Sequence, residues 1–528
     1  MKRVATLFLA AAMLLGAANS ASAIDFKIGG EWYMGFGVGQ ANLINKFRAP
    51  GADGKVRADS NDEFQALQMA RLKLEAMASE HLSGTLYFEI GDTTWGKADG
   101  FSGALGADQT SAIKLKNAYL DWSVPDTALK FRMGIQDVTL PNMAGGPAVF
   151  STDAAGLIAS YEFNDNVALT AMWVRPFNDN YKGVGYGYGH DNPSKTDGYR
   201  ASYLDNMDLF GLLLPLKFDG FEATPWVMYG MRGKNTGNFE AYQENDLGDG
   251  SPPFTFGPSP NSIYDRNTGE YGYGNIGNTG KAYGSMFWAG LPLAVTALDP
   301  FNIEFDINYG YVEAMGRYDA WRFGLQDPKR SSTQRQGWLV KALVEYKMDW
   351  GTPGIFGWYG SGDDGNPKNG SERMPTIAPV GNFTSFIGDG ELGWGPNGFY
   401  DCNTSYSGTW GIGARIKDVS FVENLSHTLT VAWWGGTNAP KMAKYMDTAY
   451  AWNDSMGNMD SYLTTNDGLL EFNLVNVWKI YENLDMNLEL GYIANFMDND
   501  TWKKAGARDT SFEKKDAWKA QVVFHYSF

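Results

Sequence analysis

Hydrophobic and polar residues alternate with a period of two along most of this chain. The pattern is clear over residues 26–38, 301–311, 484–496 and 518–528, where apolar side chains occupy every second position. Side chains that alternate in this way point to opposite faces of a β-strand. Weaker copies bring the number of strand-like segments to eighteen. The chain is therefore expected to be all-β.

The lengths of the connections alternate as well. Short links rich in turn residues follow every second segment, at residues 124–127, 164–166, 219–220, 349–353 and 481–483. The long links lie between them, notably at 176–207, 233–281, 361–403 and 435–468. This parity is typical of a transmembrane antiparallel up-and-down β-barrel with short periplasmic turns and long extracellular loops. We predict 18 strands, with 16 as the alternative.

The composition agrees with a barrel and excludes several other classes. The chain has 64 Gly, 18 Trp, 28 Tyr and 31 Phe, with a mean hydropathy of −0.33. No apolar run approaches the ~18 residues of a membrane-spanning helix. A formal net charge of −17 argues against nucleic acid as a partner, and a single cysteine excludes a disulfide scaffold.

The first 23 residues are typical of a secretory signal peptide. Lys2 and Arg3 precede an apolar stretch of limited length, and Ala21-Ser22-Ala23 forms a small-residue cleavage site. We therefore expect residues 1–23 to be removed and residues 24–528 to form one barrel domain.

Tryptophans gather toward the ends of the predicted strands, where their rings would form girdles at the two membrane interfaces. These are Trp122, Trp173, Trp338, Trp350, Trp358, Trp433, Trp434 and Trp478.

Several short motifs resemble the homotrimeric outer-membrane porins of sulfate-reducing bacteria. They are residues 68–73 (QMARLK), 118–122 (AYLDW), 131–136 (FRMGIQ) and 359–364 (YGSGDD), and the chain ends in VVFHYSF with a terminal aromatic residue. The resemblance implies a trimer of water-filled barrels in the bacterial outer membrane, in contact with lipid and lipopolysaccharide. It also implies that the insertion machinery of that membrane recognises Phe528.

The register of each strand assigns charged side chains to the inner face, where they become candidates for lining a pore. They include both signs, which favours water over a packed or plugged interior. These candidates are Arg71, Lys73, Glu75, Glu89, Asp121, Lys130, Arg132, Glu304, Asp306, Lys341, Arg415, Lys417, Glu471 and Glu489.

Within that set, Arg71, Lys73, Lys130 and Arg132 are expected to form a basic sector opposite an acidic one. The resemblance further implies a loop that folds inward after the fifth or sixth strand and narrows the pore. The matching segment is residues 138–156, with Asp153 as its candidate charged residue.

Motifs for catalysis or metal binding are weak. Residues 272–277 match G-x-G-x-x-G but lie in a long polar loop without the strand and helix that a dinucleotide site needs. The four histidines lack metal-ligand spacing, and Cys402 is a lone thiol. Asp363-Asp364 and Asp498–Asp500 do not follow a calcium-loop pattern. We therefore predict no cofactor, no resident metal and no enzyme activity.

Three functions remain open from the sequence. The first is a porin through which small hydrophilic solutes and ions diffuse passively. The second is a substrate-selective channel, for example for sugars, with Tyr33, Tyr87 and Tyr119 along its lumen. The third is an adhesin or outer-membrane enzyme that acts through its loops. Solute preference, ion selectivity and divalent-cation binding by the acidic loops are not decided by the sequence.

Overall fold

The computed structural model describes residues 24–40, 43, 63–96, 113–178, 204, 206–233, 257–258, 283–314, 317–320, 329–380, 383–384, 406–445, 452–453, 462–504 and 514–528. The predicted signal peptide, the 272–277 motif, His190 and Cys402 lie outside these residues.

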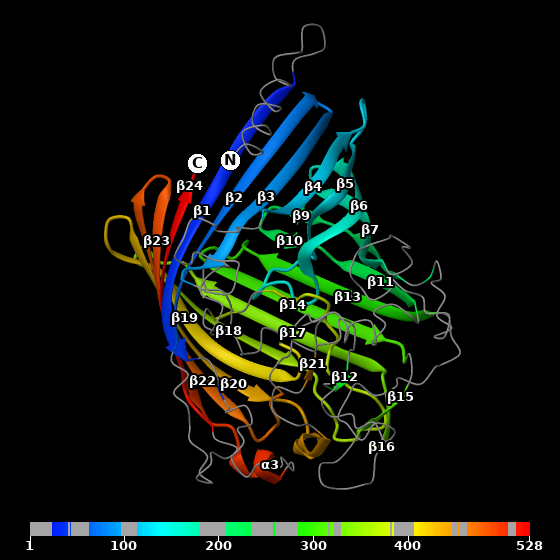
Figure 1. Ribbon diagram of the computed structural model, residues 1–528, viewed down its shortest axis with the longest axis vertical. Coiled ribbons are helices and arrows are strands. Elements are labelled where there is room, and N and C mark those ends of the chain that lie inside the picture. Colours follow the sequence, from blue (N-terminus) through cyan, green and yellow to red (C-terminus); the bar gives the residue numbers. More distant parts are fainter. Residues whose placement is uncertain are drawn as a thin grey trace.

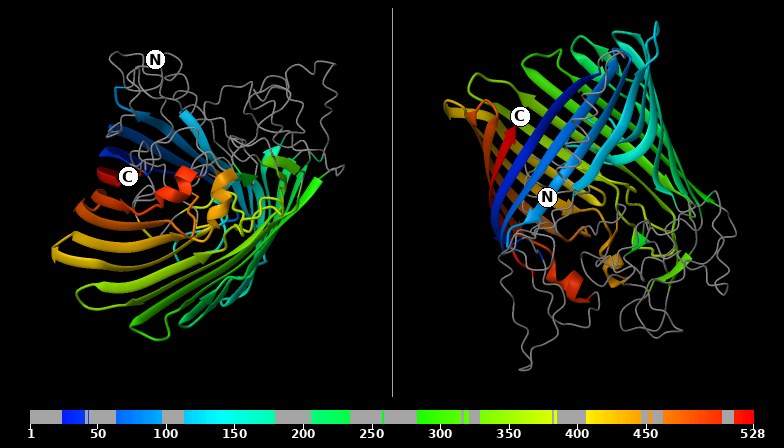
Figure 2. Two further views of the ribbon diagram at one scale, coloured as in Figure 1. Left: turned by 90° about the horizontal axis from the view of Figure 1, so that it is seen from below. Right: turned by 45° about the horizontal axis from the view of Figure 1, so that its top comes forward.

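All but four short strands of the described residues form one closed antiparallel barrel (Figures 1 and 2). Consecutive strands pair with one another, and β24 (Ala517–Ser527) returns to pair with β1 (Asp25–Gln40), where Tyr526 lies opposite Trp32. The sheet has 20 strand segments, but two pairs of segments continue one another, so the barrel has 18 strands. The expected strand number and fold class are confirmed.

Between β1 and β24 the barrel is built from segments in chain order. They are β2 (Glu63–Ser79), β3 (Leu82–Thr94), β4 (Ile113–Ser123), β5 (Leu129–Thr139), β6 (Ser151–Asn164), β7 (Val167–Asn178), β8 (Asn206–Leu213), β9 (Leu216–Phe218), β10 (Phe221–Ala223), β11 (Trp226–Gly233), β13 (Tyr283–Val295), β14 (Phe301–Val312), β17 (Arg335–Tyr346), β18 (Thr352–Gly360), β19 (Thr409–Val422), β20 (Leu425–Gly436), β22 (Gly468–Tyr481) and β23 (Leu484–Asn495).

Small elements lie outside the barrel wall. Two short strand pairs join β12 (Gly257–Pro258) to β21 (Trp452–Asn453) and β15 (Arg317–Ala320) to β16 (Lys329–Ser332). A 3-10 helix, η3 (Pro440–Tyr445), and a helix, α3 (Asn499–Lys504), lie on the long-loop side. Within the described part of the chain, no helix has both the length and the hydrophobicity to span a membrane.

Prolines interrupt two neighbouring strands of the wall. Residues 214–215 separate β8 from β9, and residues 224–225 separate β10 from β11. Pro215 and Pro225 cannot donate to the sheet, but their carbonyl oxygens accept hydrogen bonds from Ala168 and Leu214 on adjacent strands. The sheet therefore stays continuous across both breaks.

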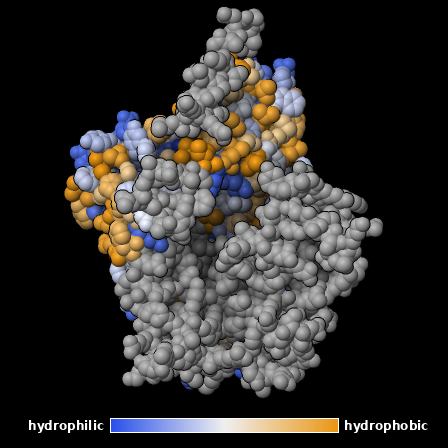
Figure 3. Space-filling view, in the orientation of Figure 1, coloured by the Kyte–Doolittle hydropathy of each residue, from blue (hydrophilic) through white to orange (hydrophobic). Residues whose placement is uncertain are grey.

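The outer face is apolar and carries aromatic residues near both rims. Trp122, Trp350 and Trp478 lie toward the short turns and are 41–58% exposed, while Trp173 and Trp338 lie toward the long loops and are 39% and 41% exposed. Figure 3 shows hydrophobic residues over the strands, outside the parts drawn in grey. Two aromatic bands around an apolar wall are typical of transmembrane barrels.

Two of the eight predicted girdle tryptophans are on the other face. Trp358 and Trp434 point into the barrel and are 4% and 1% exposed, so their assignment to a girdle was wrong. Each lies one residue from an outward-facing aromatic, Tyr359 or Trp433, and a shift of one residue reverses the face of a strand side chain.

Candidate functional site: the barrel interior

The connection between β5 and β6 folds into the barrel. It comprises residues 140–150, named here the inward loop, and is shorter than the predicted 138–156 because both flanking strands continue further. Asp153 therefore lies within β6, where its carboxylate pairs with Lys116 and accepts a hydrogen bond from Asn117. Assigning Asp153 to the loop was wrong.

The inward loop is held against the opposite wall. Asp306 on β14 accepts hydrogen bonds from the backbone N–H groups of Met143 (3.1 Å) and Ala144. Lys341 on β17 donates to the Asn142 side chain (2.9 Å) and to the Gly146 carbonyl. Asp306 and Lys341 are 1% and 0% exposed. Both residues face inward as predicted, but they lie beneath the loop and do not border open space.

A second segment, residues 361–380 and 383–384, packs beside the inward loop and is named here the second inward segment. The backbone of Ile377 and Ala378 donates to the Val149 carbonyl, and Val380 donates to that of Pro147. Tyr406, which lies just before β19, donates its hydroxyl to the Gly145 carbonyl at 2.7 Å. The two inward segments therefore form one connected structure inside the barrel.

Aromatic side chains from the wall support this structure. Phe356 and Trp358 of β18 and Trp434 of β20 pack with Phe383 and Tyr406, with ring centroids 4.3–6.4 Å apart. All five are at most 5% exposed. Part of the interior is thus a packed core, contrary to the expectation of an interior filled by water alone.

The inner face of β7–β13 is also buried and apolar. It is rich in methionine and includes Met172, Met207, Leu209, Met228, Met286 and Trp288, each at most 7% exposed. By contrast, Lys73, Lys130 and Arg132 on the inner face of β2 and β5 are exposed. The solvated part of the inner face lies along β2–β5, which we name the polar wall.

Ion pairs join neighbouring strands of the polar wall. Arg71 lies 3.3 Å from Glu89 and 4.0 Å from Glu31. Arg132 binds both carboxylate oxygens of Asp121, at 2.7 and 3.0 Å, and its guanidinium lies 4.3 Å from the centre of the Tyr119 ring. Lys130 pairs with Glu162 at 2.8 Å.

These pairs change the predicted charge pattern. Three of the four residues expected to form a basic sector each have a carboxylate beside them. Arg71 and Arg132 directly face an acidic residue on the next strand. Lys130 faces Ser160 but reaches Glu162, two residues further along β6. The fourth, Lys73, has no carboxylate within ion-pair distance among the described residues. The polar wall therefore alternates positive and negative groups.

The remaining candidate residues lie on inward positions in other surroundings. On the opposite wall, Glu345 binds Arg415 at 2.7 Å and Lys417 at 3.1 Å. Glu304 accepts a hydrogen bond from Asn302. Glu471 and Glu489 are 0% and 4% exposed and accept hydrogen bonds from Trp434 and Gln521. Glu75 faces inward near the short-turn end of β2 and is half-buried.

The sequence analysis considered Asp363 and Asp364 only as an acidic pair and missed their role, with Glu372, in fixing the second inward segment. Asp363 accepts hydrogen bonds from Ser371 and Tyr462, both at 2.7 Å, and is 3% exposed. Glu372 accepts from the Asp364 N–H (3.2 Å) and the Asn369 side chain (2.9 Å). Burial is the main cause that raises the pKa of the Glu372 carboxyl to about 7; the charges of Asp363 and Asp364 also raise this pKa, and the hydrogen bond from the Asp364 N–H opposes the rise. The only sequence signal was the density of Asp, Asn and Gly in this segment.

No metal site is found in the part of the chain that the structure describes, where no group of three or more His, Cys, Asp or Glu has a suitable arrangement. The acidic residues at Asp498–Asp500 lie at the start of α3, where the Asp498 side chain accepts hydrogen bonds from Thr501. Asp467 holds the same helix by accepting from the Asp498 N–H and the Trp502 side chain.

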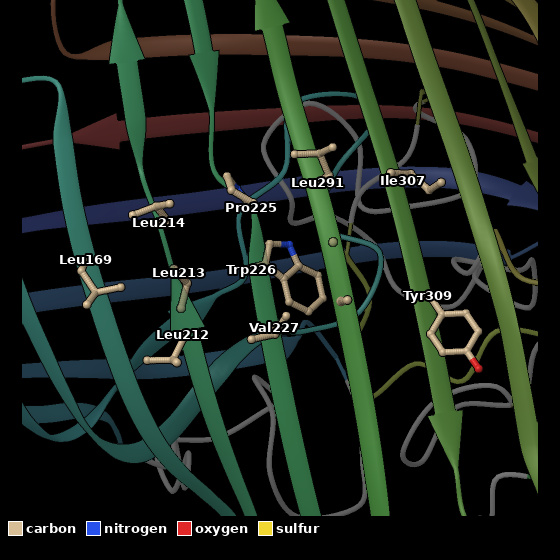
Figure 4. A pocket seen from close by; sticks show the side chains of 12 residues that line it. Leu169, Leu212, Leu213, Leu214, Pro225, Trp226, Val227, Leu291, Ile307 and Tyr309 are labelled. Atoms are coloured by element: carbon tan, nitrogen blue, oxygen red, sulfur yellow. The ribbon is translucent and has the colours of Figure 1, made fainter.

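A groove of about 530 Å³ lies on the barrel wall rather than in its interior (Figure 4). Most of its lining side chains are outward-facing and apolar, among them Leu212, Val227, Leu291 and Ile307. It crosses the strands where Pro225 interrupts the wall. This groove is suited to hydrocarbon and is not a candidate route for polar solutes.

No family model matches this chain, and no curated protein matches it. Among solved structures, it is similar to OccK8 (OprE) of Pseudomonas aeruginosa, with 10% identity, 96% and 98% of the two chains covered and a TM-score of 0.47. A BenF-like porin of Pseudomonas fluorescens Pf-5 gives 10% identity, 96% and 98% coverage and a TM-score of 0.46.

The outer membrane channel DcaP of Acinetobacter baumannii gives 9% identity, 97% and 100% coverage and a TM-score of 0.38. Similarity at this level does not identify a family. Nothing in the comparisons supports the narrower resemblance to porins of sulfate-reducing bacteria.

Proposed function

We propose that this protein is an outer-membrane channel through which small hydrophilic solutes and ions diffuse passively. The supporting observation is the polar wall, where Lys73, Lys130 and Arg132 are exposed on the inner face of a barrel whose outer face is apolar. Charged side chains retain their hydration only if water reaches them. The inward loop and the second inward segment occupy the opposite side, so the route for solutes follows the polar wall.

Passive diffusion is better supported than a sugar-selective route. Tyr33 is 6% exposed and stacks on His525 at 4.6 Å, and the face of Tyr119 is covered by Arg132. These two tyrosines therefore do not present free ring faces on which a sugar could stack. We keep the selective channel as the alternative.

A liposome-swelling assay distinguishes passive diffusion from a substrate-selective channel. Passive diffusion predicts that the rates for a series of neutral solutes fall with molecular size, without saturation as concentration rises. Saturation by one solute, with block of the others, would favour the selective channel. Absence of any swelling in liposomes that contain the folded barrel would contradict both.

We further propose that the barrel is a homotrimer that contacts outer-membrane lipid and lipopolysaccharide and is assembled by the insertion machinery of that membrane. Support for the trimer is the resemblance in sequence motifs together with the outer face of β2, which carries Ala66, Ala70 and Ala76 and the polar Gln68. Leu72 and Leu74 lie on the same face, and the small side chains beside them let a second protein surface approach closely. Native mass spectrometry in mild detergent tests the stoichiometry, and a monomer would exclude the trimer.

A further inference from the structure

The rim of the barrel that carries the short turns also carries a regular set of acidic side chains. Eight hairpin turns join β2 to β3, β4 to β5, β6 to β7, β9 to β10, β13 to β14, β17 to β18, β19 to β20 and β22 to β23. Every one of these turns has one carboxylate, and all eight side chains are exposed. This carboxylate ring consists of Glu80, Asp126, Asp165, Asp219, Asp299, Asp349, Glu423 and Glu482.

The preferences of tight turns do not explain the ring. Aspartate is favoured in turns because its side chain bonds to the local backbone, but glutamate has no such preference. Three of the eight members are Glu80, Glu423 and Glu482. Lys347 is the one lysine or arginine in these eight turns. The rim therefore has an excess of negative charge that local folding does not require.

The ring is also not neutralised by nearby cations. Glu80 lies 3.5 Å from His81, and the other seven carboxylates have no lysine or arginine within 4.0 Å among the described residues. Lys130 and Lys217, close to this rim, are paired on the strands with Glu162 and Glu222, and the exposed Lys27, Lys347 and Lys479 near the rim make no ion pair with a ring carboxylate among the described residues. By contrast, the polar wall above the ring alternates charges of both signs. The electrostatic field at the carboxylate ring is therefore negative, whereas the charges of the polar wall largely cancel.

We propose that the carboxylate ring determines the ion selectivity of the channel at its short-turn mouth, the opening on the side of the short turns. It does so by concentrating cations and repelling anions there. The proposal rests on the function proposed above, because it requires that ions pass through this mouth. The field of fixed charges at a channel mouth raises the local concentration of counter-ions. Its reach is the Debye length, which is about 30 Å at 0.01 M salt, about 10 Å at 0.1 M and about 3 Å at 1 M. The effect therefore depends on the salt concentration on the short-turn side alone.

Reversal potentials of oriented single channels test this directly. Dilute salt, near 10 mM KCl, is placed first on the short-turn side and then on the long-loop side, with concentrated salt opposite. We expect a stronger preference for cations when the dilute solution bathes the carboxylate ring. Orientation is read from one-sided labelling of Asn483→Cys, an exposed turn position, in a Cys402→Ser background.

Two half-ring variants test whether the carboxylate ring causes the difference in cation preference between the two salt directions. The first combines Glu80→Gln, Asp126→Asn, Asp165→Asn and Asp219→Asn, and the second combines Asp299→Asn, Asp349→Asn, Glu423→Gln and Glu482→Gln. Each is expected to lower the cation-to-anion permeability ratio roughly two-fold with dilute salt on the short-turn side, and to leave it unchanged at 1 M. Lys347→Gln should shift the ratio in the opposite direction, and Asp364→Asn, on the segment after β18, should not shift it.

The outcomes are distinct. Equal reversal potentials for the two salt directions in the wild-type channel, or conducting half-ring variants with unchanged potentials, would overturn the proposal while leaving the channel function intact. If the folded wild-type barrel shows no conductance at all, the proposed channel function itself is contradicted. If one half-ring variant fails to assemble, the other half-ring and Lys347→Gln still decide the question.

Discussion

Asp306 shows how a side chain on the inner face can shape a route without bordering it. Its carboxylate is occupied by the N–H groups of Met143 and Ala144, so it positions the inward loop. Phe305, the preceding residue, faces outward at the middle of β14, between the exposed aromatic residues Phe301 and Tyr309. Neighbouring residues of one strand thus act on opposite faces of the wall.

Replacing Asp306 by alanine is expected to release the inward loop. The buried N–H of Ala144 would lose its acceptor at a cost of about 1–3 kcal/mol, and the half-buried N–H of Met143 would lose its acceptor at a smaller cost. The barrel itself should still close, because the ladder of β14 is unaffected. Single-channel recording should then show a larger and noisier current than wild type. Glu304→Gln on the same strand is the control, since the Glu304 side chain accepts a hydrogen bond from Asn302 and makes none with the loop. If Asp306→Ala gives the same current as wild type, Asp306 does not position the inward loop.

Phe305→Arg is expected to destabilise the folded barrel in a bilayer by about 2–4 kcal/mol, because it places a charge on the lipid face near the midplane. Equilibrium denaturation from liposomes measures this change. The inward Glu304→Arg should have a smaller effect on unfolding and a larger effect on conductance. Equal free energies of unfolding for the two variants would mean that the inward and outward assignment of β14 is incorrect.

At the scale of elements, the ladder that closes the barrel between β1 and β24 extends to the last residue of the sequence. Phe528 donates its N–H to the Gly30 carbonyl and accepts a hydrogen bond from the Gly30 N–H, at 3.0 and 2.9 Å. Its ring packs over Gly30, where a Cβ atom would lie 2.4 Å from the phenyl carbon Cζ. A Cβ atom at Gly30 would also lie 2.7 Å from the backbone oxygen of Arg71, which cannot move aside as a side chain can, so a glycine suits this position.

Deleting Phe528 is expected to lower the amount of folded barrel in the outer membrane several-fold, because the closing ladder loses its final pair. Heat modifiability on gels, measured in membrane fractions, reports the folded fraction. A shortened 251–262 loop is the control and should assemble normally. Normal assembly without Phe528 would show that neither closure nor recognition depends on this residue.

The segment that carries Glu372 should respond to pH. Its pKa is about 7 in the structure against 4.5 for an unperturbed glutamate, so the ordered segment favours the neutral carboxyl. The resulting stabilisation is complete below about pH 4.5 and is lost as the pH rises through about 7. Amide exchange of residues 361–374, corrected for intrinsic rates, should therefore accelerate as the pH rises from about 4.5 to about 7, with no further effect of this carboxyl above pH 7. Glu372→Gln should abolish this dependence, and identical profiles for the two proteins would contradict it.

The elements were predictable from the sequence because each strand has one face in an apolar surrounding, so its alternation is strong. Strand number and the parity of loop lengths followed from that. The limits of the inward loop did not, since residues 151–156 have weak alternation and yet pair fully with β5. The inward direction of Trp358 and Trp434 was also missed, because the alternation does not separate a membrane girdle from an aromatic core inside the barrel.

At the scale of the whole molecule, the interior is divided into a packed side and a solvated side. The inward loop, the second inward segment and the aromatic cluster fill the side toward β14–β20, while the polar wall remains exposed to solvent. Charge composition alone could not predict this division. Inward carboxylates such as Asp306 and Glu471 have the same sequence signature whether water or a loop covers them, and only the fold of distant loops decides between the two.

We propose that solutes pass along the polar wall beside the inward loop. The most direct measurement is the single-channel current of Lys73→Cys in a Cys402→Ser background while a charged, membrane-impermeant thiol reagent is added. We predict a stepwise fall in current for Lys73→Cys and no change for Asn308→Cys, whose position is 4% exposed on the packed side. Block at Asn308→Cys together with no effect at Lys73→Cys would contradict the account.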